Sequence, residues 1–233
     1  MIRKIRDHMV LRRALTAYAA GDFATAQKLF RRILAKKPDA PGIRHNLALT
    51  CIAVGQYDEA EPLLLNELEN YGEYYPRVKV LADLYYISGN RSKAHDFYKR
   101  SRELDPPEHD VALLDKRIAL TSDDNVYEQV TAAHRSFEDG NELMAEERWD
   151  QAISHFRHAA DLDPTNIHAL NNAGTIYLNN RDEPAEAVKL FRQALAWSPL
   201  PWIKRNLAQA EGLLEHQRAE TESAQKPTRR RKV

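Results

Sequence analysis

The stretch that decides the fold is Arg148 to Pro164, RWDQAISHFRHAADLDP. Its apolar residues recur every three or four positions: Trp149, Ala152, Phe156 and Ala159. This spacing places them on one face of a helix, and Pro164 brings that helix to an end. A single helix with one apolar face cannot bury that face by itself. The rest of the chain must therefore supply partner helices.

A repeat of 34 residues supplies these partners. The glycines Gly21, Gly55 and Gly89 are 34 residues apart, and each opens a similar phrase: GDFATAQKLF, GQYDEAEPLL and GNRSKAHDFY. Within each phrase one position is always alanine and another is always large and apolar: Ala26, Ala60 and Ala94, then Phe30, Leu64 and Tyr98. A second amphipathic segment precedes each glycine, for example at 43–54 and 78–87. The repeating unit is therefore predicted to be helix, short glycine turn, helix.

This pattern resembles that of the tetratricopeptide repeat family, which is W-x2-L-G-x2-Y, A-x3-F and P within 34 residues. The last full copy matches at Leu170, Ala173, Gly174, Tyr177, Ala187, Phe191 and Pro199. The copy before it matches at Ser136, Asp139, Gly140, Leu143, Ala152, Phe156 and Pro164. The second copy has Gly72 where the proline is expected. The resemblance implies an all-α fold, a right-handed superhelical solenoid of antiparallel helix pairs with a C-terminal capping helix.

One interruption divides the array. Pro106 and Pro164 are 58 residues apart, 24 more than one period, and the extra residues contain a predicted helix at 109–121. We expect two modules with a hinge at 122–125, and the alternative is that the extra helix continues the stack. The expected boundaries are 1–121 with repeats at about 7–40, 41–74 and 75–108, and 126–217 with repeats at about 133–166 and 167–201 and a capping helix at 202–217. Residues 218–233 lack apolar periodicity, so we expect a disordered basic tail.

The composition excludes several classes of protein. The 34 basic and 34 acidic residues cancel, so the molecule as a whole is not an obvious polyanion binder. The single cysteine, Cys51, cannot form an internal disulfide. No apolar run is long enough for a signal peptide or a membrane span, so we expect a cytoplasmic protein.

Catalytic motifs are missing from the sequence. His155 and His158 could share a helix face and hold a metal, with Asp161 and Asp163 beyond. The repeat places them on an outward-facing second helix without a third ligand, so a solvated face is the favoured interpretation. Cys51 occupies a packing position that tyrosine fills in two other copies. We therefore expect no catalytic residue, no metal and no cofactor.

The resemblance also implies a concave surface lined by the first helix of each repeat. The predicted groove residues share one helix face: His45, Asn46, Lys79, Asp83, Phe137, Asn141, Asn171, Asn172, Thr175, Arg205 and Asn206. An asparagine recurs there in the phrases HNLA, NNAG and RNLA, and an amide both donates to and accepts from a peptide backbone. The alternative is that these asparagines bridge neighbouring helices. The sequence thus predicts a non-catalytic scaffold that binds a peptide segment of a partner protein and takes part in a larger assembly.

The two ends of the chain suggest an alternative function. The segment Lys226 to Lys232 contains five basic residues, and Arg3, Lys4, Arg6, Arg12 and Arg13 form a second group. Such clusters can bind nucleic acid or an anionic membrane surface. The tail could also dock on acidic residues of another copy and cause self-association, or serve only to keep the protein in solution.

Overall fold

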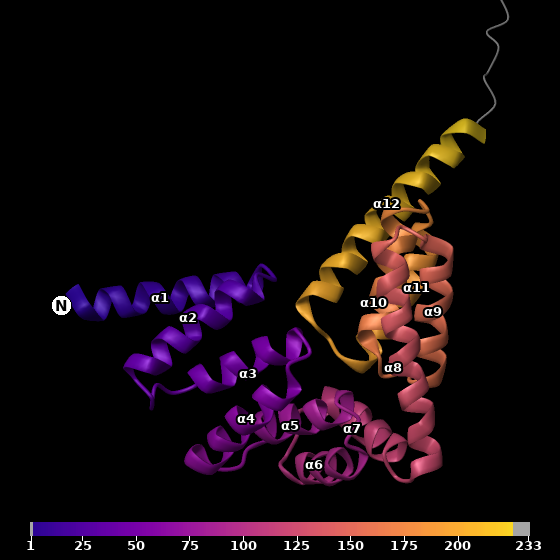
Figure 1. Ribbon diagram of the computed structural model, residues 1–233. Coiled ribbons are helices and arrows are strands. Elements are labelled where there is room, and N and C mark those ends of the chain that lie inside the picture. The colour runs from indigo at the N-terminus through magenta and orange to yellow at the C-terminus, as the bar shows by residue number, and fades with distance from the viewer. Residues whose placement is uncertain (1, 226–233) are drawn as a thin grey trace, which may run out of the picture. The chain divides into compact units, whose positions relative to one another are not determined.

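The computed structural model describes residues 2–225, which form helices connected by short turns and contain no strand (Figure 1). The helices are α1 (Ile2–Ala19), α2 (Phe23–Lys36), α3 (Ile43–Ala53), α4 (Tyr57–Tyr71), α5 (Tyr75–Ile87), α6 (Arg91–Glu103), α7 (Glu108–Leu120), α8 (Asp124–Ala145), α9 (Trp149–Leu162), α10 (Ile167–Asn179), α11 (Pro184–Trp197) and α12 (Pro201–Gln225). The predicted all-α class and its helix pairs are confirmed. No helix among the described residues is long and apolar enough to cross a membrane.

The chain forms two compact units. Unit 1 runs to Pro106 and contains α1 to α6, and unit 2 begins at Pro107 and contains α7 to α12. Within each unit, every helix packs against the next one along the chain. The predicted extra helix at 109–121 is α7. Its Arg117 donates from Nε to Thr165 Oγ1 at 3.0 Å, in the turn between α9 and α10. Because of such contacts α7 belongs to unit 2, so the division falls one helix before the boundary expected at residue 121, and the hinge at 122–125 stays a prediction.

The polar sequence after α7 begins a helix. The Asp123 carboxylate accepts a hydrogen bond from the backbone N–H of Val126 at 3.0 Å, which caps α8. An N-cap of this kind stabilises a helix by about 1 kcal/mol. This cap explains why α8 starts at Asp124, well before the repeat that it opens.

Each helix pair combines a bulky side chain on its second helix with a small residue on its first. The bulky residues are at most 2% exposed: Phe30, Leu64, Tyr98, Phe156 and Phe191. The small residues sixteen or seventeen positions earlier are also buried: Ala14, Ala48, Ala82, Gly140 and Gly174. In unit 2 the two groups touch closely, since a methyl group on Gly174 would lie 2.7 Å from Cε1 of Phe191. Burying each large side chain contributes about 1.5–3 kcal/mol, so this register holds the pairs together.

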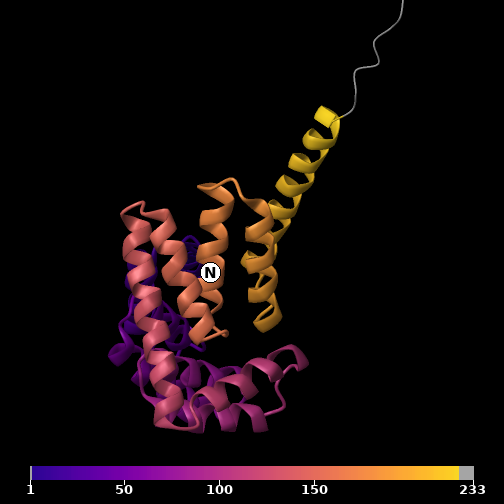
Figure 2. The same cartoon turned by 90° about the vertical axis from the view of Figure 1, so that its right-hand side faces the viewer.

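The capping helix is longer than the sequence predicted. It was expected to end at residue 217, but α12 continues to Gln225. Gln217 donates from Nε2 to Asp182 Oδ1 at 3.1 Å in the turn between α10 and α11, and the following residues extend past that turn (Figure 2). We expected a disordered tail from residue 218, whereas residues 218–225 continue the helix, and their helix formers favour it. The basic segment Lys226 to Lys232 lies outside the described residues.

Replacing Gly174 by alanine is expected to lower the free energy of unfolding by about 1–3 kcal/mol, the usual cost of overpacking. The added methyl would overlap the ring of Phe191, which is fully buried. Urea denaturation followed by circular dichroism measures the change. The matched control is Gly212→Ala in α12, where nothing lies within 4 Å of the added methyl. That control should gain up to about 1 kcal/mol from helix propensity. An equal gain in Gly174→Ala would contradict the close contact.

Candidate functional site

In unit 2 the predicted groove asparagines form two pairs across neighbouring helices. Asn172 on α10 donates from Nδ2 to Asn141 Oδ1 on α8 at 3.2 Å. Asn206 on α12 donates from Nδ2 to Asn171 Oδ1 on α10 at 2.8 Å. All four side chains are only partly buried. They therefore bridge adjacent helices, which was the alternative role considered from the sequence, and they remain accessible.

Each asparagine pair keeps hydrogen-bonding capacity after the bridge has formed. A primary amide has two N–H donors and a carbonyl oxygen with two lone pairs. Among the described residues no second hydrogen bond engages these four side chains. In the first pair, Asn172 Oδ1 can still accept and Asn141 Nδ2 can still donate. A peptide backbone offers the complementary N–H and C=O groups, so bridging and peptide binding are compatible.

The other predicted residues of unit 2 have different environments. Phe137 packs on the core, with its ring centroid 5.8 Å from that of Phe156 at an angle of 50°. Thr175 is half-buried and Arg205 is exposed. Phe137 therefore serves mainly as a packing residue, while Arg205 is free to approach a ligand.

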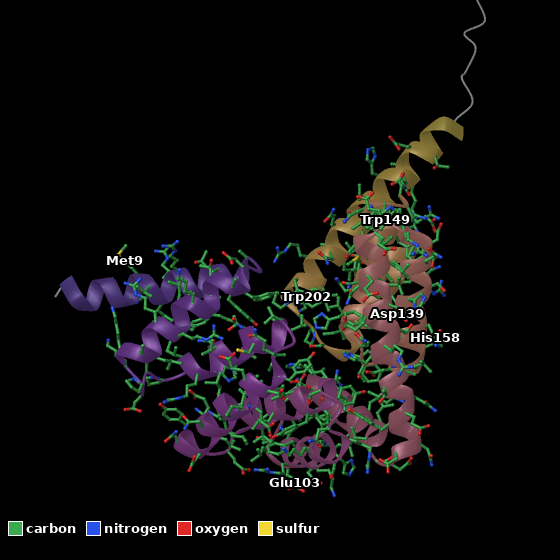
Figure 3. The ribbon with its side chains drawn as sticks, in the orientation of Figure 1. Met9, Glu103, Asp139, Trp149, His158 and Trp202 are labelled. Atoms are coloured by element: carbon green, nitrogen blue, oxygen red, sulfur yellow. The ribbon has the colours of Figure 1, made fainter. Side chains whose placement is uncertain are left out.

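An aromatic stack between α10 and α12 was missed by sequence reasoning. The rings of His168 and Trp202 are stacked, with centroids 5.6 Å apart and an angle of 20°. Trp202 lies on the side of unit 2 opposite to His158 of α9 (Figure 3). The stack lies on the same two helices as the pair of Asn171 and Asn206 and adds a flat apolar surface there.

The outward surface of unit 2 contains two open concavities. One of about 470 Å³ is lined by residues that include Leu190 and Trp197, and one of about 570 Å³ is lined by residues that include His158 and Arg181. Within the described chain no group of three His, Cys, Asp or Glu residues could hold a metal. Asp163 accepts from the backbone N–H and the hydroxyl of Thr165 and serves the turn after α9. Neither concavity contains a predicted groove residue.

In unit 1, Lys79 and Asp83 are paired with each other on α5. Lys79 Nζ donates to Asp83 Oδ2 at 2.8 Å, and the hydroxyl of Tyr98 donates to Asp83 Oδ1 at 2.7 Å. Both carboxylate oxygens therefore accept hydrogen bonds within the unit. The ion pair therefore holds Lys79 against its own helix.

The other two predicted residues of unit 1, His45 and Asn46, line a pocket of about 190 Å³. The pocket is formed by α3, α4 and the start of α5, and its walls also include Pro41, Gly42, Glu67, Tyr71, Tyr74 and Arg77. Sequence reasoning missed Glu67. It occupies the position that the other repeats fill with Ile33, Ser101, Ala159 and Ala194. A charged residue at a position that otherwise packs between helices was the sequence signal that could have identified Glu67. His45 and Asn46 thus belong to a pocket that includes an unexpected carboxylate.

Glu67 is buried without a partner for one of its oxygens. The residue is 2% exposed, and Oε1 makes no hydrogen bond within residues 2–225. The nearby Arg77 is engaged elsewhere, since its Nη1 donates to the carbonyls of Tyr71 at 2.9 Å and of Gly72 at 3.1 Å. Its guanidinium also lies over the ring of Tyr74, 4.3 Å from the centroid. Arg77 therefore closes the end of α4 and leaves Glu67 unpaired.

The charges in this pocket act on His45 in opposite directions. Burial lowers the pKa of the imidazole, the carboxylate of Glu67 raises it, and the guanidinium of Arg77 lowers it. The net pKa lies below the usual value for histidine. At neutral pH the ring is therefore neutral and presents one nitrogen as a hydrogen-bond acceptor.

Replacing Glu67 by glutamine is expected to lower the pKa of His45 further, because the change removes the negative charge that favours the protonated ring. Titration of the histidine signals by NMR measures the shift. The exposed Glu69 on the same helix provides the control, and Glu69→Gln should shift this pKa less. An unchanged His45 pKa in Glu67→Gln would contradict the electrostatic interaction between these two side chains.

Comparisons with known proteins give one family. A family model described as a tetratricopeptide repeat matches residues 17–67 in unit 1 and 143–199 in unit 2. A search of curated proteins gives no match.

Several solved structures are similar to this chain. TTC0263, a thermophilic TPR protein of Thermus thermophilus, is 20% identical, with 88% of this chain and 98% of that one covered and a TM-score of 0.45. YrrB, a TPR protein with an unusual peptide-binding site, is 16% identical, with 83% and 87% covered and a TM-score of 0.43. The TPR2AB domain of yeast Sti1 in complex with pHSP90 is 15% identical, with 91% and 86% covered and a TM-score of 0.45.

The matched segments agree with the helix pairs and with the buried small and bulky residues of both units. Proteins of this family are generally interaction modules without enzymatic activity, which gives the chain the general role of a protein–protein interaction scaffold. Each of the two compact units therefore contains tetratricopeptide repeat sequence, at residues 17–67 in unit 1 and 143–199 in unit 2.

Proposed function

We propose that this protein binds an extended segment of a partner protein along the first helices of unit 2 and thereby brings the partner into a larger assembly. The observation that carries the proposal is the pair of asparagine bridges, Asn141 with Asn172 and Asn171 with Asn206. These bridges connect three helices, α8, α10 and α12, so one extended segment that crosses the helices could meet both pairs.

The proposed binding mode divides affinity and selectivity between different side chains. Amide groups recognise a peptide backbone whatever its sequence, and each hydrogen bond contributes about 0.5–1.5 kcal/mol net. Selectivity would come from the stacked rings of His168 and Trp202 and from the exposed cation of Arg205. The asparagines are already held in place by their bridges, which reduces the entropy lost on binding. We therefore expect moderate and reversible affinity.

Unit 1 offers a second surface of the same kind. Lys79 and Asp83 on α5 and Asn46 on α3 lie on first helices, as the asparagines of unit 2 do. We propose these residues as a separate binding surface within unit 1. The proposal requires no catalytic residue and no cofactor.

Peptides that bind the full chain can be selected from a random display library, and they provide ligands for a direct test. For such a peptide, Asn172→Ala and Asn206→Ala are each expected to weaken binding about fivefold to tenfold, the value of one hydrogen bond. Fluorescence anisotropy measures the Kd. Gln193→Ala, which removes an exposed amide from the second helix α11, should leave the Kd unchanged. Equal Kd values in all variants, with cooperative melting retained, would rule out the asparagine pairs as a binding site.

Truncation after Gln225 separates this function from the alternative that involves the basic ends. If the asparagine pairs bind the ligand, the truncated protein should retain its Kd and a shallow dependence on salt. If Lys226 to Lys232 are responsible, truncation should abolish a binding that weakens steeply as salt increases. Sedimentation of the same truncated protein shows whether the tail contributes to self-association.

A further inference from the structure

We propose that the pocket formed by α3, α4 and the start of α5 binds the ammonium group of a lysine side chain from a partner protein. The pocket is the one lined by Glu67, His45, Asn46, Tyr71 and Tyr74 in unit 1. The inference rests on the proposed function in one respect, since it takes the lysine to belong to a bound protein segment. The inference goes beyond the proposed function because it names the side chain of the partner, a lysine, and the pocket that binds it.

The unpaired carboxylate of Glu67 is the first observation. Its Oε1 is buried without a hydrogen bond in the described chain, and the residue lines the pocket. A buried charge without a partner is costly, and proteins rarely keep one. The packing of α4 does not require it, because Ala159 and Ala194 fill the equivalent position in unit 2. A cation from outside is the partner that would satisfy this oxygen.

Arg77 does not fill this role. Its Nη1 is held by the backbone carbonyls of Tyr71 and Gly72, and its guanidinium rests on the ring of Tyr74. The C-terminal end of α4 carries the partial negative charge of a helix end, which offsets part of the guanidinium charge. Arg77 therefore shapes the pocket, and the carboxylate remains available for a second cation.

The acceptors in the pocket suit an ammonium group better than a guanidinium group. Glu67, the carbonyl oxygen of Asn46 and a ring nitrogen of neutral His45 come from two helices and three side chains. An ammonium group is compact and has three diverging donors that can reach acceptors on different side chains. A guanidinium group has its donors in one plane and is best matched by the two oxygens of a single carboxylate. The pocket therefore favours lysine over arginine.

The size and the rim of the pocket indicate one side chain rather than a larger ligand. Its volume of about 190 Å³ is smaller than the roughly 300–1,000 Å³ of sites for drug-sized molecules. Tyr71 and Tyr74 line it and are 39% and 47% exposed. The methylene stem of a lysine packs well along apolar surface while its charged end reaches a polar group. In this pocket the rings of Tyr71 and Tyr74 provide the apolar surface, and Glu67 provides the polar group.

The test uses Nα-acetyl-lysine N-methylamide as the probe, titrated into the full chain and followed by ¹H–¹⁵N NMR. The expected result is a saturable shift of the His45, Asn46 and Arg77 signals, weakened at least tenfold in Glu67→Gln and unchanged in Glu69→Gln. The Tm of Glu67→Gln should equal or exceed that of the wild type, because a buried unpaired charge has been removed. The corresponding norleucine derivative, which has the stem without the ammonium group, should not bind.

Four results would overturn the proposal: no saturable shift at these signals, equal binding by Glu67→Gln, equal binding of the norleucine derivative, or n-butylamine binding as tightly as the capped lysine. The last result would assign the pocket to a free amine instead of a protein side chain. Asn172→Ala in unit 2 should leave probe binding unchanged. Failure of the lysine pocket is therefore distinguishable from failure of the asparagine pairs.

Discussion

The structure depends on the close approach of two helices at one position in each repeat. A bulky side chain of the second helix is fully buried at the level of a small residue on the first, as with Phe191 and Gly174. No β-carbon fits between the ring and the backbone in the two pairs of unit 2. A fixed approach of this kind determines which face of each first helix is buried. The remaining face is left to polar side chains, which in unit 2 include the asparagine pairs.

Two departures from the repeat pattern occur together in the second repeat, and both affect the same pocket. Glu67 replaces an apolar or small residue, and Gly72 replaces the proline that ends the other second helices. Gly72 has φ of 74° and ψ of 173°, a conformation that is essentially restricted to glycine. The turn it makes leaves its carbonyl and that of Tyr71 to accept hydrogen bonds from Arg77. The residues that depart from the framework therefore build the pocket around the unpaired carboxylate.

The framework could be predicted from the sequence because it follows from spacing alone. A small residue, a bulky residue and a helix-ending residue at fixed intervals define a helix pair wherever they occur. Helix ends outside the repeat were less certain, and α12 shows why. Residues after Gln217 lack apolar spacing, but their residue types still favour a helix. The extra helix α7 was also found, but its assignment to unit 2 depends on contacts such as that between Arg117 and Thr165. These residues are 48 positions apart, and no local pattern connects them.

The candidate sites were predicted in part, since periodicity places side chains on a face but not in contact with one another. Asn141 and Asn172 were expected on the same surface, and their hydrogen bond depends on how near α8 and α10 lie. The sequence presented bridging and ligand binding as alternatives. The two roles are compatible, because a hydrogen bond between two asparagines uses only one of the N–H donors and one of the oxygen lone pairs. A bridge orients the remaining amide groups, so the contact between the helices is compatible with the peptide binding that we propose. Glu67 is the opposite case, because its buried Oε1 makes no hydrogen bond within the described chain.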